Sequence, residues 1–154
     1  LVEMGVEIQE DGDALIVRRS GKLTSTNVKT MPYPGFPTDC QPQLMSLCAV
    51  SRGLTTVREE IFESRFTHKN DLIKMGADIE TCGKNAIIKG VKTLKGADVS
   101  AMDLRGGAAL VIAGLMAEGK TVVRNAFHVQ RGYEDLEEGL RALGGFIETK
   151  REET

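Results

Sequence analysis

Apolar positions along the chain recur with two different periods, and these periods follow one another in the same order twice. A period of two is typical of strands, whereas apolar positions three and four residues apart are typical of helices. Each occurrence of the pattern predicts two strands, a third strand, a helix, a fourth strand and a closing helix. We therefore expect an α/β (α+β) fold with repeat units at about residues 5–75 and 76–147 of one domain, 1–154.

The predicted elements occupy equivalent places in the two units. In the first unit we expect strands at 6–9, 14–17, 27–30 and 53–58, and helices at 39–52 and 68–75. In the second unit we expect strands at 77–80, 86–89, 98–101 and 119–124, and helices at 103–118 and 133–143. One such unit cannot bury both its sheet and its helices, so the two units should pack about a pseudo-symmetry axis.

A short segment at the start of each unit occurs three times. Residues 1–8, 72–79 and 140–147 align, and each is predicted to hold the last turn of a helix, a Gly and then a strand. Gly fits there because the residue after a helix commonly takes a left-handed conformation that only Gly adopts at low cost. The chain thus opens inside a helix without an initiator Met, and we interpret it as a piece of a longer protein.

The two units differ just before their longer helix. The first unit has the Pro-rich segment 31–38 there, whereas the second has only Met102. Prolines restrict the backbone and favour a loop over a helix or strand. Because functional residues often lie on loops held by a rigid scaffold, this segment is a candidate part of a site.

Composition narrows the class of protein. The chain is 41% hydrophobic and 27% charged, as expected for a globular domain. Its net charge of −2 gives no electrostatic reason to expect nucleic acid or a membrane as a partner, and the apolar run 108–117 is about half a membrane span. The three Cys and two His residues do not have the spacing of metal ligands, so we expect no metal site. The odd number of Cys residues favours a protein of the reducing cytoplasm.

Two acidic and three basic residues are candidates for chemistry. Asp39 and Asp103 lie at the starts of the longer helices, where an Asp commonly does no more than cap the helix. Arg65 and Arg131 recur after the fourth strand of each unit, and Arg105 lies in a first helical turn, where the helix dipole disfavours a cation unless an anion is bound. The alternative to capping is therefore a pocket for a highly anionic ligand, in which an ionised Asp acts as a base.

Three other features carry less weight. Residues 114–121 satisfy the P-loop pattern, but a predicted helix precedes them and a strand follows, which is the reverse of the order that a P-loop needs. We interpret Gly119 as the end of the helix instead. Cys40 has no His base nearby in sequence and is expected to be a buried or half-buried thiol, and His68 is expected to begin a surface helix.

Several motifs together resemble the enolpyruvyl transferase family. They are Gly-Phe-Pro-Thr-Asp-Cys-Gln at 35–41, Glu-Ser-Arg-Phe at 63–66, Asp-Leu-Arg at 103–105 and Gln-Arg-Gly-Tyr-Glu at 130–134. The Pro-Thr-Asp-x-Gln motif is similar to the branch that acts on UDP-N-acetylglucosamine, not to the shikimate-pathway branch. The resemblance implies an inside-out α/β barrel of αβ units with pseudo-threefold symmetry, of which this chain holds about two of three.

The resemblance also implies a reaction and a set of roles. Enolpyruvyl would pass from phosphoenolpyruvate to the 3-hydroxyl of UDP-N-acetylglucosamine with release of phosphate, without cofactor or metal, as the first committed step of peptidoglycan synthesis. Asp39 would be the base and Asp103 would handle the proton at the enolpyruvyl carbon. The substrate-binding residues implied are Thr38, Asp39 and the Ile61 backbone for the UDP-sugar, and Arg65, Arg105 and Arg131 for phosphoenolpyruvate.

Part of the family's machinery is absent from this sequence. The resemblance implies a mobile-loop Cys and a Lys–Asn pair in an N-terminal part of the same enzyme, which is therefore the expected partner. Cys40 does not match that Cys, and Gly106 and Gly107 replace bulkier small residues. The chain alone is thus expected to be inactive, and a non-catalytic UDP-sugar-binding module is the alternative.

Overall fold

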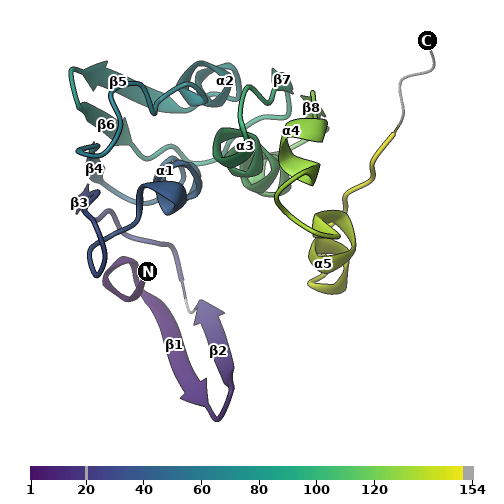
Figure 1. The fold of residues 1–154 in the computed structure, drawn as a ribbon, viewed down its shortest axis with the longest axis horizontal. Helices are drawn as coiled ribbons and strands as arrows, with labels where there is room; N and C mark the ends of the chain where they lie inside the picture. The colour runs from purple at the N-terminus through teal and green to yellow at the C-terminus, as the bar shows by residue number, and fades with distance from the viewer. Residues whose placement is uncertain (20, 151–154) are drawn as a thin grey trace.

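The computed structural model describes residues 1–19 and 21–150, and its elements follow the predicted order (Figure 1). The first unit contains β1 (Val6–Asp11), β2 (Ala14–Arg19), β3 (Val28–Lys29), α1 (Gln41–Cys48), β4 (Leu54–Arg58) and α2 (Lys69–Lys74). The second contains β5 (Asp78–Cys82), β6 (Asn85–Lys89), β7 (Asp98–Ser100), α3 (Leu104–Met116), β8 (Val122–Arg124), α4 (Phe127–Gln130) and α5 (Leu136–Ala142). The 3₁₀ turn η1 (Val2–Met4) lies where the last turn of a helix was predicted, whereas the 3₁₀ turn η2 (Thr38–Cys40) and helix α4 were not predicted.

The main sheet is assembled from both units. Strand β3 lies parallel to β4, and the β5–β6 hairpin of the second unit joins through β6, which runs antiparallel to β4. The order is therefore β3-β4-β6-β5. Strands β7 and β8 form a separate parallel pair, and β1 and β2 form a hairpin that projects from the body (Figure 1).

The two hairpins have matching patterns but very different burial. Ile79 and Ile88 of the β5–β6 hairpin are 5% and 0% exposed, whereas their counterparts Ile8 and Val17 are 39% and 58% exposed. The difference arises because β6 pairs with β4, while within the described residues β2 pairs only with β1. An alternating pattern thus gives a buried strand only where a neighbouring strand and helix cover it.

Helices α1 and α3 pack side by side at the centre of the molecule and carry much of its core (Figure 1). Met45 on α1 and Leu110 on α3 are fully buried, and the Ser46 hydroxyl donates a hydrogen bond of 2.8 Å to the Ala109 carbonyl across the interface. Gly107 allows α4 and the end of β7 to approach α3, since a Cβ there would lie 2.5 Å from the Val129 side chain. The packing fixes the N-terminus of α3, where Asp103 and Arg105 lie.

The glycines of the thrice-repeated segment behave as predicted. Gly5, Gly76 and Gly144 have φ angles of 92°, 90° and 88°, which is the left-handed region, and each follows the end of a helix or 3₁₀ turn. The strand predicted after Gly144 does not form within the described residues, where Phe146 is 99% exposed. A strand needs a hydrogen-bonding partner, and the described chain offers none beyond this Gly.

Several helix ends differ from prediction. Helix α1 begins at Gln41 and ends at Cys48 instead of spanning 39–52, because Thr38–Cys40 form the 3₁₀ turn η2 and Pro42 occupies the first helical turn. The closing helices shorten to Lys69–Lys74 and Leu136–Ala142. Gly119 does have a positive φ, but the helix is capped at Ala117, so the interpretation of Gly119 as the cap is wrong. Helix α3 before it and β8 after it confirm that 114–121 is not a P-loop.

Candidate active site

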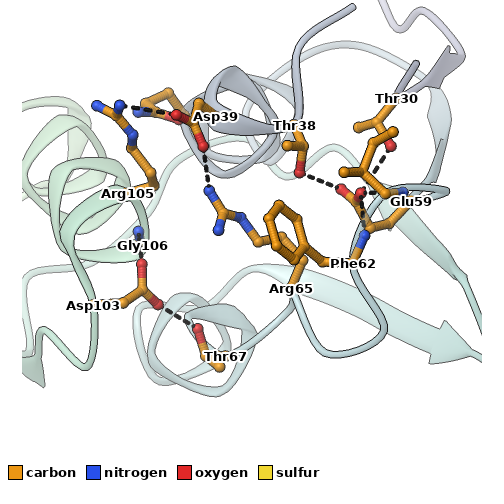
Figure 2. A network of polar contacts seen from close by, with 12 residues as sticks. Thr30, Thr38, Asp39, Glu59, Phe62, Arg65, Thr67, Asp103, Arg105 and Gly106 are labelled. Carbon is orange, nitrogen blue, oxygen red and sulfur yellow. Dashed lines mark hydrogen bonds and ion pairs between the residues drawn. The ribbon is translucent and has the colours of Figure 1, made fainter. Parts of the chain in front are cut away.

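Asp39 lies at the centre of a polar network that joins three segments of the chain (Figure 2). Its Oδ1 accepts a hydrogen bond of 2.7 Å from Arg65, and its Oδ2 accepts one of 2.9 Å from Arg105. The prediction that Asp39 caps its helix is wrong, because the N-cap of α1 is Cys40 and no side chain caps that end. The 3₁₀ turn η2 places the Asp39 carboxylate before the first turn of α1, so it accepts from arginines instead of backbone amides.

Arg105 reaches Asp39 from the first turn of α3. Its second terminal nitrogen donates a hydrogen bond of 2.9 Å to the Tyr133 hydroxyl, which also accepts one of 3.0 Å from Gln43. The bonds to Tyr133 and then to Asp39 raise the pKa of Arg105 above its usual value. The anion that offsets a cation at this helix N-terminus is therefore the Asp39 carboxylate, which lies 66 residues earlier in the chain.

Arg65 approaches Asp39 from the loop between β4 and α2. Its guanidinium carbon lies 4.9 Å from the centre of the Phe62 ring, close enough for a cation–π contact. Ring and carboxylate together restrain the guanidinium, while the Asp39 side chain remains 53% exposed. Two arginines held in this way form a ready donor set for a carboxylate or phosphate group of a ligand.

Asp103 caps α3, as predicted. Its Oδ1 accepts a hydrogen bond of 2.8 Å from the Gly106 amide, and its Oδ2 accepts one of 2.7 Å from the Thr67 hydroxyl (Figure 2). Burial alone would raise the pKa of Asp103. The amides of Gly106 and Arg105, the Thr67 hydroxyl and the Arg65 charge outweigh burial and lower that pKa below its usual value. Asp103 therefore combines capping with the properties of an ionised carboxylate beside the arginines.

The remaining predicted residues lie around this centre. The Thr38 hydroxyl donates to Glu59, and so does the Ile61 amide, while the Ile61 side chain is 41% exposed. Arg131 follows α4, is exposed, and forms no side-chain hydrogen bond or ion pair with any residue of 1–19 or 21–150. The structure thus joins Asp39, Arg65 and Arg105 directly and leaves Arg131 outside the network.

Two expectations about single residues are wrong. Cys40 is exposed instead of buried, because η2 carries it to the surface beside Asp39. His68 precedes α2 as expected but is only 2% exposed, and neither of its ring nitrogens bonds to another described residue. Burial lowers the pKa of His68 to about 4, against the opposing charge of Asp103. The imidazole is therefore neutral in the folded protein at neutral pH.

The buried His68 predicts a specific loss of stability in acid. The unfolded chain takes up a proton on this residue near pH 6.5, but the folded chain does so only near pH 4. The free energy of unfolding is therefore unaffected by His68 protonation above pH 6.5. It decreases as the pH falls below 6.5, and at pH 4 the loss is about 3 kcal/mol. Urea unfolding of the wild type and of His68→Met at pH 7 and pH 4 should show this difference.

The other histidine supplies the control for that measurement. His128→Gln retains His68 and should show the same acid loss as the wild type. If His68→Met lost as much stability between pH 7 and pH 4 as the wild type, the buried imidazole would not be its source. An apolar side chain is tolerable at position 68 because neither ring nitrogen has a partner among the described residues.

Sequence reasoning missed Tyr133 and Glu59. Tyr133 was seen only as the start of a helix, although it orients Arg105, and its place in the Gln-Arg-Gly-Tyr-Glu motif is the signal that could have identified it. Glu59 had no sequence signal beyond its charge. Within the described residues, no group of three or more His, Cys, Asp and Glu side chains is placed to hold a metal ion, and no helix is long and apolar enough to span a membrane.

Comparison with known proteins gives this geometry a family context. The sequence profile of the family described as EPSP synthase (3-phosphoshikimate 1-carboxyvinyltransferase) matches residues 1–140. UDP-N-acetylglucosamine 1-carboxyvinyltransferase 2 of Carboxydothermus hydrogenoformans is 55% identical over 150 residues, which cover 96% of this chain and 36% of that protein. The UDP-N-acetylglucosamine 1-carboxyvinyltransferase of Clostridium botulinum is 50% identical over 147 residues, which cover 96% of this chain and 35% of that protein. This chain thus spans about a third of the length of these two relatives.

Solved structures agree with the sequence relatives. The enolpyruvyl transferase NikO from Streptomyces tendae superposes with a TM-score of 0.85 at 32% identity, over 96% of this chain and 34% of that chain. EPSP synthase from Acinetobacter baumannii shares the fold, with a TM-score of 0.67 at 19% identity over 97% of this chain and 36% of that chain. The family expected from the motifs at 35–41 and 103–105 is confirmed: this chain belongs to the EPSP synthase (3-phosphoshikimate 1-carboxyvinyltransferase) family of enolpyruvyl transferases.

Proposed function

We propose that this chain takes part in the transfer of enolpyruvyl from phosphoenolpyruvate to the 3-hydroxyl of UDP-N-acetylglucosamine, with release of phosphate. The observation that carries the proposal is the Asp39 carboxylate held between Arg65 and Arg105, since one arrangement provides both a base and donors for an anion. The acceptor is assigned from the two UDP-N-acetylglucosamine 1-carboxyvinyltransferases that are 50% and 55% identical to this chain. The reaction would serve peptidoglycan synthesis in the cytoplasm.

The proposed role of Asp39 is that of a general base. The 3-hydroxyl of the sugar gives its proton to the Asp39 carboxylate as its oxygen forms a bond to C2 of phosphoenolpyruvate, and C3 takes a second proton from a general acid that the proposal assigns to the N-terminal part of the enzyme. Arg65 and Arg105 orient the carboxylate through hydrogen bonds of 2.7 and 2.9 Å. Since the Asp39 side chain is 53% exposed, a hydroxyl group can reach it without a rearrangement of the chain.

The proposed role of Asp103 belongs to the second half of the reaction. The bond from C2 to the phosphate oxygen breaks, phosphate leaves, and the methyl group at C3 loses a proton to restore the double bond. Because its pKa is lowered, Asp103 is ionised at neutral pH. It can therefore accept this proton, but it carries no proton to donate at the addition step. Asp103 is therefore assigned to the elimination; within residues 1–19 and 21–150, its Oδ2 accepts a side-chain hydrogen bond from the Thr67 hydroxyl alone.

The arginines are assigned to the charges of phosphoenolpyruvate. Arg105 donates to both Asp39 and Tyr133, so it can exchange the Asp39 bond for one to a substrate oxygen while Tyr133 keeps it in place. Arg131 is exposed and, among the described residues, makes no competing side-chain contact. A preorganised cation such as Arg105 stabilises the charge that builds up as phosphate leaves. Thr38 and the Ile61 backbone are assigned to the UDP-sugar.

The proposal includes a missing partner. Asp39 and Arg131 face solvent, and ligand sites normally bury most of the ligand between opposing walls. The opposing wall is assigned to the N-terminal part of such an enzyme, which would bring its loop Cys and Lys–Asn pair. We therefore expect the chain alone to release no phosphate.

A chimeric enzyme tests the proposed function. The Carboxydothermus relative aligns with this chain over 150 residues, so this chain can replace that segment in the full-length protein. The chimera should release phosphate from phosphoenolpyruvate only when UDP-N-acetylglucosamine is present, and shikimate 3-phosphate should not substitute for the sugar. The isolated chain, measured alongside, should release none.

Two outcomes would contradict the proposal. A folded chimera that binds UDP-N-acetylglucosamine but releases no phosphate would favour a non-catalytic UDP-sugar-binding module. Tight binding of the sugar nucleotide by the isolated chain would favour the same alternative, because half of a cleft should bind weakly. Titration calorimetry on the chain and on the chimera measures both.

A further inference from the structure

We infer that Glu59 is a positioning residue for the sugar-nucleotide half of the site, acting through Thr38, Ile61 and Phe62. The inference rests on the proposed function for the identity of the substrate. Glu59 is the first residue after β4, and its side chain is only 1% exposed. Burying a carboxylate costs free energy unless hydrogen-bond donors surround it. The donors that contact Glu59 therefore indicate which segments it positions.

Four donors from three chain segments converge on Glu59 (Figure 2). Its Oε1 accepts from the Thr30 hydroxyl at 2.9 Å, the Ile61 amide at 2.9 Å and the Phe62 amide at 3.1 Å. Its Oε2 accepts from the Thr38 hydroxyl at 3.0 Å. Thr30 in turn accepts from the Glu60 amide at 2.8 Å, which closes the loop around the carboxylate. The carboxylate thus ties the end of β3, the start of η2 and the loop after β4 together.

These segments carry the candidate catalytic residues. Thr38 immediately precedes Asp39 in η2, and the loop that holds Phe62 continues to Arg65. The Phe62 ring also supports the Arg65 guanidinium at 4.9 Å. Both ends of the Asp39–Arg65 ion pair therefore lie on backbone that Glu59 fixes, although Glu59 touches neither residue. The Pro-rich loop before η2 is held by the isolated β-bridge between Thr30 and Phe36 and by the hydrogen bond of 3.0 Å from the Met31 amide to the Phe36 carbonyl, and Glu59 adds the contacts that join it to the loop after β4.

The repeat provides an internal comparison. Arg58 and Arg124 end the equivalent strands β4 and β8, so the position equivalent to Glu59 in the second unit is Asn125. Asn125 is exposed, and its side chain donates a hydrogen bond of 2.9 Å to the Ser100 hydroxyl. The fold of a unit therefore does not need a buried acid at this position. The four-donor arrangement belongs to the first unit, which carries Thr38, Asp39 and Ile61.

The chemistry of the contacts favours a carboxylate over an amide. An ionised carboxylate has two acceptor oxygens, whereas Gln has one, and its NH₂ group only donates. Glu59→Gln should retain the bonds on one side and force the Thr38 hydroxyl to accept instead of donate. Glu59→Ala should release all four donors. The two variants should therefore have effects of different size. Glu60→Gln is the matched control, because it removes the charge of a neighbouring half-buried carboxylate that pairs with Lys29, Arg58 and Lys84.

Kinetics of the chimera test the effect on the site. Glu59→Ala should raise KM for UDP-N-acetylglucosamine about tenfold and lower kcat. KM for phosphoenolpyruvate should rise less, because Glu59 bonds Thr38 and Ile61 directly but reaches Arg65 only through Phe62. Glu59→Gln should recover most of the loss, and Glu60→Gln should match the wild type. Equal changes in both KM values, or no change in either, would overturn the inference. A chimera that is inactive with wild-type Glu59 would instead refute the proposed function.

Hydrogen exchange on the 154-residue chain tests the same residue without any activity. The Ile61 and Phe62 amides, whose acceptor is Glu59, should exchange about tenfold faster in Glu59→Ala, while the amides that join β4 to β6 keep their protection. If the Ala variant does not fold, Glu59→Gln is measured instead. The exchange rate of the Cys40 amide in η2, close to Thr38, is then the quantity compared with the wild type. Unchanged exchange at these amides would show that Glu59 does not hold the loops.

Discussion

Replacing Asp39 with Asn is expected to lower kcat of the chimeric enzyme about a thousandfold, because general bases contribute about 10²–10⁴-fold to catalysis. Asn has the same shape and retains an acceptor for one of the two arginines, but it cannot take a proton from a sugar hydroxyl. KM for phosphoenolpyruvate should change far less than kcat. Steady-state phosphate release at saturating concentrations of both substrates measures the effect.

Asp98 offers a matched control for this substitution. It is also an exposed carboxylate paired with an arginine, since Arg124 donates to its two oxygens at 2.8 and 2.7 Å, but it lies on β7 outside the network of Figure 2. Asp98→Asn should leave kcat within about twofold of the wild type, as is usual for loss of a surface ion pair. If Asp39→Asn kept more than about a tenth of the wild-type kcat, Asp39 would not be the base.

Replacing Arg105 with Ala is expected to lower kcat/KM for phosphoenolpyruvate by about 10²–10³-fold, the usual effect of removing one preorganised donor from a developing anion. Arg105→Lys should recover little. An ammonium group keeps the charge, but it does not reproduce the planar fork with which Arg105 bonds Asp39 and Tyr133 at the same time. Initial rates at varied phosphoenolpyruvate concentration, with the sugar nucleotide saturating, separate KM from kcat.

Arg141 provides the control for Arg105. It is an exposed arginine on α5 that pairs with Glu137 at 2.8 Å, so Arg141→Ala removes a guanidinium and a similar ion pair away from the network around Asp39. This variant should retain wild-type kinetics. If Arg105→Lys matched the wild type, a simple positive charge would suffice, and the role assigned to the fork would be wrong.

Local patterns in the sequence predicted much of the fold because they depend on local physics. Gly5, Gly76 and Gly144 were identified from their repeated context, and each has the positive φ that only Gly adopts cheaply. Asp103 was predicted to cap α3, and its bond to the Gly106 amide is a contact over three residues. The order of strands and helices follows from apolar periodicity in the same way.

Predictions failed where the answer lies in residues distant along the chain. Capping of its helix was one of two interpretations of Asp39, but its partners are Arg65 and Arg105, which are 26 and 66 residues away. His68 was expected at the surface, yet packing buries it beside Gly106 of α3. Ile8 and Ile79 have the same sequence context and opposite burial. Periodicity places a side chain on a face of its own element but does not say what covers that face.

The sequence by itself determined the repeat, the left-handed glycines, the Asp103 cap and, through its motifs, the family to which the chain belongs. Each of these depends on a short stretch of residues and its backbone preferences. Only the tertiary structure decided that Asp39 is shared by two arginines, that Tyr133 supports Arg105, and that Glu59 holds the loops beneath them. A charged side chain forms a hydrogen bond with a partner that packing brings within about 3 Å. Which partner that is depends on where segments distant in sequence meet.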